Sequence, residues 1–228
     1  MREVVFFIYK MKPFIVDEEM KYSIWSALES ADGFRKTGLL VAPRSAHAKS
    51  KSSLDGSPLG ELAVGAVNLS FALELYLKAL LLHFSIKPIA THKLHKLYLE
   101  IPEDLRKHMS IVYAKALEVR IENESEFTIS GFFHSSDPEH MEKKSSWADP
   151  SNPPLDTLLK AHEDAFYHWR YGVFELKTLE LGYQFNFRAF ATCVDVARDI
   201  AWSILKAKNG IPDREKRPNP SHWPKAFE

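Results

Sequence analysis

The pattern of apolar and polar positions predicts a mainly helical chain built around one central helix. Between residues 68 and 84, apolar side chains occupy almost every helical face, and Glu74 and Lys78 are the charged exceptions. A helix that is apolar on all sides is normally surrounded by other helices. The pair Ser57-Pro58 is typical of a helix start, with serine as the N-cap and proline at the first position. We therefore expect a long, buried helix from Ser57 to residue 84.

Other segments repeat apolar residues at helical spacing, and two short apolar runs are typical of strands. Asp17 is the expected N-cap of the first helix, and Gly33 is its expected stop. Further helices are expected at 20–31, 155–169 and 188–207, and strands at 4–9 and 127–133. A short helix with Leu94, Leu97 and Tyr98 is expected to be capped by Thr91. Another helix is expected to start at Pro102 and to carry on one face Leu105, Met109, Val112, Ala116 and Val119.

Together these elements predict an all-α fold, an up-and-down helical bundle of about five helices with one or two marginal short strands. The chain has 228 residues, which fits one large domain. We assign residues 1–208 to that domain, with a polar loop inserted at about 135–154. Residues 209–228 contain four prolines and are expected to form a poorly ordered tail.

The overall charge gives no reason to expect a nucleic acid or a membrane as partner. Lys plus Arg and Asp plus Glu both total 30 residues, so any such function must rest on local patches. The strongest local candidate is the segment 35–58, a predicted basic loop that carries Arg44, Lys49 and Lys51. Two interpretations remain open: a solvated connector, or a loop that contacts phosphate groups.

Cysteine content and hydropathy predict a protein of the reducing cytoplasm. Cys193 is the single cysteine, so no intramolecular disulfide can form, and its apolar helical surroundings favour a buried thiol. The apolar run at residues 4–9 is too short for a secretory signal. Polar and charged residues interrupt the segment 59–84, which makes it a poor membrane span, and we expect no membrane partner.

Three motifs give the chain a resemblance to a known superfamily. They are N-x2-FA-x-ELYLKALL, then Pro88-x3-His92-x-Leu94, and later WRY-x3-E. This combination resembles the HEPN-like superfamily, helical-bundle domains of bacterial defence, toxin–antitoxin and RNA-processing systems. The match covers roughly residues 59–208. The matching residues are Asn68, Phe71, Ala72, Glu74 to Leu81, His92, Leu94, Trp169, Arg170, Tyr171 and Glu175.

The resemblance implies a homodimer, and in active members it implies RNA cleavage without metal by an Arg-x4–6-His pair. In those enzymes the arginine neutralises the scissile phosphate while the histidine moves a proton from the ribose hydroxyl. The sequence has this spacing only at Arg217 and His222, in the proline-rich tail rather than near the end of a late helix, and Arg170 has no histidine in the ten residues after it. Whether the chain is an enzyme is therefore left open.

The central helix carries a polar stripe that is the first candidate site. Ser70, Glu74 and Lys78 follow one another at intervals of four residues and so lie on one helical face. Charges on so apolar a helix need partners, because an unpaired buried charge is very costly. Arg170 is the expected partner of Glu74, given the resemblance. The stripe is either a buried structural ion pair or a polar site open to a ligand.

The remaining candidates are His92, Arg170 and Tyr171. His92 and His95 lie three residues apart, but no further cluster of ligands accompanies them, so we expect no metal and no cofactor. His92 either braces a helix start or faces a cleft as an acid or base. Trp169, Arg170 and Tyr171 form either a packing corner or a site where the arginine binds phosphate and a ring stacks on a base.

These observations lead to three functional hypotheses. The first is an intracellular RNA-associated accessory protein of a defence or stress-response system, either noncatalytic or a divergent metal-independent ribonuclease. In the ribonuclease, Arg170 binds phosphate, His92 moves protons and Lys78 adds positive charge. The second is a non-enzymatic module that binds a cognate protein. The third is a bundle that binds a nucleotide or small ligand at Glu74, Lys78 and Arg170.

Overall fold

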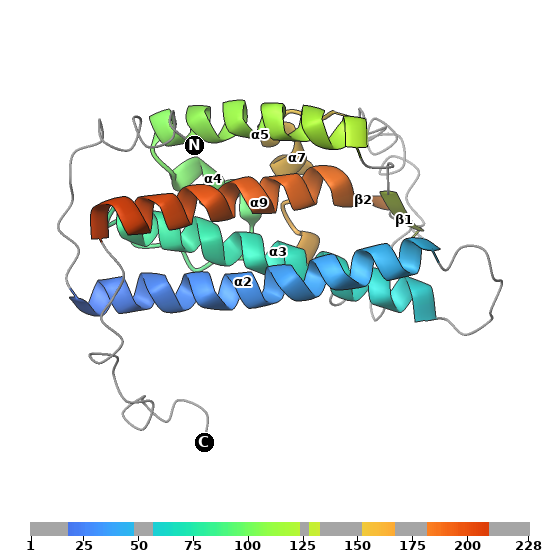
Figure 1. Cartoon of the computed structure of the whole chain (residues 1–228), viewed down its shortest axis with the longest axis horizontal. Helices are drawn as coiled ribbons and strands as arrows, with labels where there is room; N and C mark the ends of the chain where they lie inside the picture. Colours follow the sequence, from blue (N-terminus) through green and yellow to red (C-terminus); the bar gives the residue numbers. More distant parts are fainter. Residues whose placement is uncertain (1–17, 48–56, 124–127, 133–151, 167–181, 210–228) are drawn as a thin grey trace, which may run out of the picture.

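Four long helices make up most of the described chain, and helices and strands are labelled as in Figure 1. The computed structural model describes residues 18–47, 57–123, 128–132, 152–166 and 182–209. The prediction of an all-α helical bundle is confirmed. The helices are α2 (Glu18–His47), α3 (Ser57–His83), α4 (Leu94–Glu100), α5 (Glu103–Asn123), α7 (Leu155–Ala161) and α9 (Phe187–Ile204), which continues into the π-helical turn η3 (Leu205–Asn209).

Helix α3 lies at the centre of the bundle, as its apolar pattern predicts. It contacts α2, α4 and α9, and α9 in turn packs against α5 on its other side (Figure 1). Leu69, Leu73, Leu77 and Leu81 are fully buried along its length. Burial of each such leucine contributes roughly 1.5–3 kcal/mol, which explains why this helix forms the core. It begins at Ser57 as expected and ends at His83, one residue before the expected end.

Helix α2 is longer than the sequence predicts. We expected it to stop near Gly33, but it continues to His47. A glycine inside a helix costs about 1 kcal/mol relative to alanine. Packing along α3 offsets this cost, since Gly38 lies directly against α3: a methyl group at Gly38 would be 2.8 Å from Leu69 Cγ and 3.0 Å from the Gly65 carbonyl oxygen.

The predicted basic loop is therefore wrong for its first part. Residues 35–47 are helical and belong to α2, so Arg44 lies on a helix rather than on a loop. Lys49 and Lys51 lie outside the described residues.

Two boundaries near α4 and α7 also differ from the sequence prediction. Thr91 does not cap α4, whose N-cap is Lys93 without a side-chain cap; the Thr91 hydroxyl accepts a hydrogen bond from the Lys93 amide instead. The helix expected at 155–169 is interrupted after Ala161. Just after the interruption, the Glu163 carbonyl accepts a hydrogen bond from the Leu94 amide of α4 at 3.1 Å. This backbone group therefore bonds to α4 instead of continuing the expected helix.

Helix α5 presents a narrower buried face than its sequence pattern suggests. Leu105, Met109, Tyr113 and Leu117 are buried at intervals of four residues. Val119, which we expected on this face, is 59% exposed. It lies two residues beyond Leu117, about 200° around the helix, so it points away from the core.

A two-stranded antiparallel sheet lies at one end of the bundle (Figure 1). β1 (Thr128–Phe132) pairs antiparallel with β2 (Gly182–Asn186), in a register that places Thr128 opposite Asn186. This confirms the strand expected at 127–133, whereas the strand expected at 4–9 lies outside the described residues. β2 runs directly into α9, because the Asn186 side chain caps that helix by accepting a hydrogen bond from the Ala189 amide.

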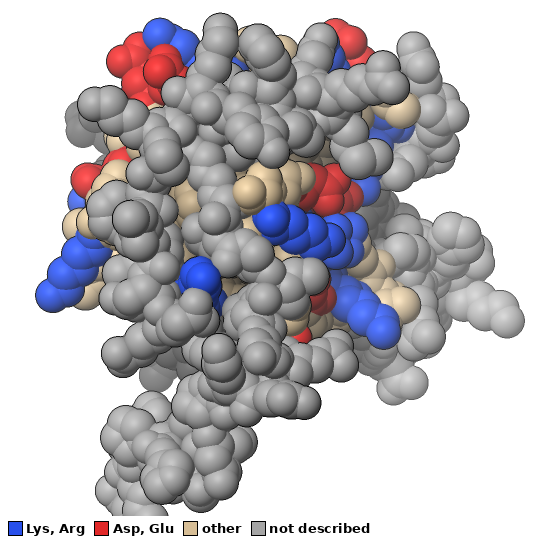
Figure 2. All heavy atoms as spheres, turned by 60° about the vertical axis from the view of Figure 1, so that its left-hand side comes forward, with Lys and Arg blue, Asp and Glu red and all other residues tan. Residues whose placement is uncertain are grey.

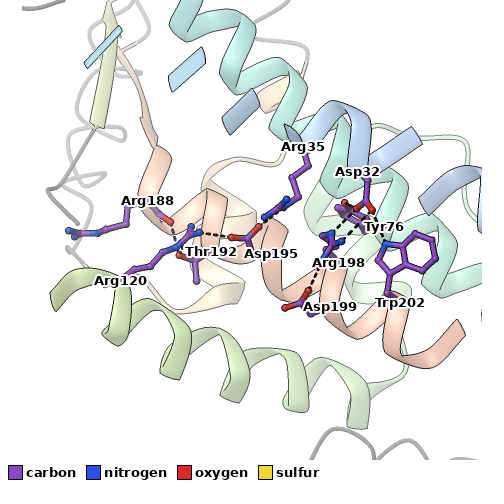
Figure 3. A network of polar contacts seen from close by, with 10 residues as sticks. All are labelled: Asp32, Arg35, Tyr76, Arg120, Arg188, Thr192, Asp195, Arg198, Asp199 and Trp202. Atoms are coloured by element: carbon purple, nitrogen blue, oxygen red, sulfur yellow. Dashed lines mark hydrogen bonds and ion pairs between the residues drawn. The ribbon is translucent and has the colours of Figure 1, made fainter. Parts of the chain in front are cut away.

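Polar contacts tie α9 to the helices on both sides of it (Figure 3). Asp195 of α9 pairs with Arg35 of α2 and with Arg120 of α5. One carboxylate of α9 therefore connects α2 and α5.

One described segment, Ala63–His83, is long and apolar enough to cross a membrane, and 67% of its most apolar stretch is buried inside the bundle. The core helix of a soluble protein has the same length and composition, so this segment is weak evidence for a membrane span.

Candidate functional site

A buried carboxylate on α3 is the centre of the candidate site. The side chain of Glu74 is 2% exposed, although it lies on the most apolar of the four long described helices. It accepts a hydrogen bond from Lys78 Nζ at 2.7 Å, and both of its oxygens lie 3.0–3.1 Å from Nδ1 of His92. Lys78 compensates the negative charge, which would be very costly to bury alone, and His92 adds a hydrogen bond.

The imidazole of His92 is held on one edge and one face. Its Nδ1 edge meets Glu74, and its ring stacks on Phe166 with a centroid distance of 5.1 Å and an interplanar angle of 24°. Phe166 in turn contacts Phe71 of α3 at 5.5 Å. The His92 side chain is nevertheless 63% exposed, so the Nδ1 edge is anchored while much of the ring remains open to solvent. We call Glu74, Lys78, His92 and Phe166 the Glu74 cluster.

Contacts between two chain segments place His92 beside Phe166. His92 lies two residues before α4, and Phe166 lies in the short turn region after α7. The Leu94 amide donates to the Glu163 carbonyl at 3.1 Å, and Lys93 Nζ pairs with Asp164 at 3.1 Å. Residues immediately next to both rings are therefore fastened to each other.

The structure brings together part of the site that the sequence suggests. Glu74, Lys78 and His92, all named as candidates, are in direct contact. Arg170, the expected partner of Glu74, lies outside the described residues, and so does Tyr171. The described partners of Glu74 are Lys78 and His92.

Sequence reasoning missed two features of the cluster. It did not pair His92 with Glu74, and it did not single out Phe166 as the ring under the imidazole. The i, i+4 spacing signalled the contact between Glu74 and Lys78, but no comparable signal joins residues 74, 92 and 166. Ser70, on the same predicted stripe, instead donates its hydroxyl to the Ala66 carbonyl of its own helix at 2.7 Å.

Neither metal ligation nor a broad charged surface explains the cluster. Among the described residues, no three His, Cys, Asp or Glu side chains come together in a way that suits a metal ion. Figure 2 shows one face of the bundle on which the described basic and acidic side chains lie interspersed. The described side chains seen on that face form no extended field of one sign, so the argument for a ligand rests on local chemistry.

The cluster has the components of a proton-transfer site. Histidine is the side chain most often used as a general acid or base, and a carboxylate hydrogen-bonded to one ring nitrogen orients the other. Lys78, whose side chain is 25% exposed, adds a positive charge beside the Glu74 carboxylate.

No family model, curated protein or solved structure matches this chain. The chemistry of the Glu74 cluster therefore has to be argued from its own geometry, and the HEPN-like resemblance enters only as a proposal.

Proposed function

We propose that this chain is a HEPN-like, RNA-associated bundle of an intracellular defence or stress-response system, and that it contacts RNA at the Glu74 cluster. The observation that carries the proposal is the exposed imidazole of His92, anchored at Nδ1 by the buried carboxylate of Glu74. An imidazole held in this way is suited to exchange a proton with a bound hydroxyl group or to donate to a phosphate oxygen.

The favoured version is a divergent ribonuclease that works without metal. In it, His92 moves a proton at the ribose, and Lys78 stabilises negative charge on the phosphate. The cluster takes the place of an Arg-x4–6-His pair near the end of a late helix. Arg170, Tyr171, Arg44, Lys49 and Lys51 remain proposed RNA contacts, because the structure does not describe their side chains. In the noncatalytic version, the same groups bind RNA and no bond is broken.

The test is an RNA-cleavage assay in EDTA, run beside an RNA-binding assay by fluorescence anisotropy. Wild-type protein is compared with His92→Ala and with the matched control His95→Ala. His95 lies three residues further along and pairs with Asp156 at 3.0 Å, so its removal deletes a histidine of the same segment outside the cluster. We expect cleavage to fall about 100-fold or more in His92→Ala and to stay within about twofold of wild type in His95→Ala.

The results of the two assays distinguish the ribonuclease from the noncatalytic RNA-binding version. Binding that weakens in His92→Ala, with no cleavage by any variant, supports the noncatalytic version. Equal loss in the two histidine variants, with both folded by circular dichroism, argues against a site at His92. Neither binding nor cleavage across varied RNA and salt conditions contradicts the whole proposal.

A second function, a protein-interaction module, is supported by the outer face of α5. Ile111 is 56% exposed and Val119 is 59% exposed, and their spacing of eight residues puts them about 80° apart, on the same solvent-facing half of the helix. Large apolar side chains that share an exposed helix face are a feature of interaction sites. The homodimer implied by the HEPN-like resemblance is one partner that this face can serve.

The test of this second function is the mass of the protein in solution by light scattering. If α5 forms the contact, the double variant Ile111→Glu, Val119→Glu is monomeric at concentrations where wild type is dimeric. Its melting temperature stays close to that of wild-type monomer, because both side chains already face solvent. An unchanged mass for a dimeric wild type places the contact elsewhere.

A further inference from the structure

We infer that Glu74 is a positioning residue that holds the neutral His92 ring with its hydrogen on Nδ1, so that Nε2 is the exposed proton acceptor of the Glu74 cluster. The inference rests on the proposed function and extends it by naming the reacting atom and the group that orients it. It assigns Glu74 a role through His92, without contact between Glu74 and the ligand.

The tautomer follows from the hydrogen-bonding capacity of the two groups. Both carboxylate oxygens of Glu74 lie 3.0–3.1 Å from Nδ1 of His92. An ionised carboxylate only accepts hydrogen bonds, so the ring nitrogen that faces it has to carry the hydrogen. In a neutral imidazole the other nitrogen then bears the lone pair. Nε2 is consequently the basic atom.

The carboxylate itself is held firmly. Its side chain is 2% exposed, and Oε1 also accepts a hydrogen bond from Lys78 Nζ, so both its position and its negative charge are fixed by α3. Phe166 covers one face of the imidazole and restricts its rotation. Among the described residues, Lys78 of α3 pairs with Glu74, while Lys93, next to His92, pairs with Asp164.

A second histidine on the same segment provides an internal contrast. His95 faces Asp156 through Nε2, at 3.0 Å, and its side chain is only 16% exposed. The same reasoning places the hydrogen of neutral His95 on Nε2, the opposite tautomer. Two histidines three residues apart thus carry their hydrogen on opposite ring nitrogens, because a different carboxylate faces each ring.

In the proposed reaction, Nε2 of His92 takes the proton of a ribose 2′-hydroxyl. The freed oxygen forms a bond to the adjacent phosphorus, the bond from phosphorus to the 5′ oxygen breaks, and that oxygen takes a proton from water. The ring becomes an imidazolium whose positive charge lies beside the Glu74 carboxylate, which stabilises it. The neutral ring returns when the added proton passes to solvent.

The decisive measurement is the tautomer of each histidine in protein labelled with nitrogen-15, read from long-range hydrogen–nitrogen NMR correlations at alkaline pH, where imidazole is neutral. Signals are assigned by comparison with His92→Ala and His95→Ala. We expect hydrogen on Nδ1 for His92 and on Nε2 for His95. Glu74→Gln should raise the population of His92 that carries its hydrogen on Nε2 and leave the His95 tautomer unchanged. Asp156→Asn should raise the population of His95 that carries its hydrogen on Nδ1 and leave the His92 tautomer unchanged.

A His92 ring with its hydrogen on Nε2 in the wild type would overturn the inference. Glutamine keeps the size of glutamate and offers Nδ1 an amide donor as well as an acceptor, so it weakens the tautomer preference without removing the hydrogen bond, and we expect the variant to fold. If it does not, the wild-type spectrum still decides the tautomer. None of these spectra requires RNA activity, so a failed proposed function and a failed inference give different results.

Kinetics provide the second readout. In Glu74→Gln we expect kcat for RNA cleavage to fall about 100-fold or more in the folded protein, with KM within about threefold. A purely structural role predicts that kcat is preserved in the protein that remains folded, and that result would also overturn the inference.

Discussion

Asp32 on α2 and Arg198 on α9 are 166 residues apart in sequence and form two hydrogen bonds, from Nε at 2.8 Å and from Nη2 at 3.4 Å. The same carboxylate accepts a hydrogen bond from Trp202 Nε1 at 3.1 Å and from the hydroxyl of Tyr76 on α3 (Figure 3). One aspartate therefore joins three helices. Burial and the hydrogen bond to Asp32 together raise the pKa of Tyr76, which keeps its hydroxyl a donor.

Removal of this shared acceptor should destabilise the bundle. Asp32→Ala leaves the buried Tyr76 hydroxyl and the Trp202 ring without this partner, and we expect the free energy of unfolding to fall by about 2–3 kcal/mol in urea titrations. Asp199→Ala is the control, because Asp199 also pairs with Arg198 but its side chain is 73% exposed. The control should change stability by less than about 0.5 kcal/mol. Equal effects would show that Asp32 is no more than a surface charge.

Two glycines of α2 should respond to alanine with opposite signs. A methyl group added at Gly33 would meet nothing within 4 Å outside its own helix backbone, so Gly33→Ala should stabilise the protein by up to about 1 kcal/mol through helix propensity. At Gly38 the added methyl meets Leu69 and the Gly65 carbonyl at 2.8–3.0 Å, and we expect a loss of about 1–3 kcal/mol. Urea midpoints of the two variants measure the contrast. Stabilisation at both positions would mean that α2 and α3 do not approach closely at Gly38.

His162 should make the stability depend on pH. Its Nδ1 bonds to the Leu158 carbonyl at 3.0 Å, and its ring packs against Phe185 and Phe190. Burial lowers the pKa of His162 from 6.5 to about 4, although the bond to Leu158 acts in the opposite direction. The folded state therefore keeps the ring neutral at a pH where the unfolded chain binds a proton. This contribution is complete above pH 6.5 and is lost as the pH falls from 6.5 towards 4.

The predicted loss over that window is roughly 3 kcal/mol, since each pKa unit corresponds to about 1.4 kcal/mol. His162→Met removes the titrating ring and should flatten the stability profile between pH 6.5 and 4, as measured by urea unfolding at a series of pH values. A profile as steep as that of wild type would assign the acid sensitivity to other groups.

Cys193 should be inert in the folded protein. It is fully buried on α9, and this burial, with a smaller effect of Asp195, raises the pKa of its thiol. Because the thiolate is the reactive form, we expect no labelling by a thiol reagent under native conditions and one equivalent in guanidinium chloride. Rapid labelling of the native protein would contradict the burial of this helix face.

The sequence by itself determined the elements whose signals are local. Helix α3 was predicted to within one residue at its end, because the Ser57-Pro58 start and the unbroken apolar faces are properties of neighbouring positions. The contact of Glu74 with Lys78 also follows from helical spacing. The need of a buried carboxylate for a partner is likewise a general physical rule.

Only the tertiary structure decided where α2 ends and which groups complete the site. Gly33 is a local signal for a helix end, but packing against α3 overrides it and the helix runs on to His47. His92 reaches Glu74 because its neighbours on α4 are fastened to the residues after α7, a contact that no spacing in the sequence encodes. Local propensities are worth about 1 kcal/mol at most positions, whereas such long-range packing and pairing depend on the whole fold.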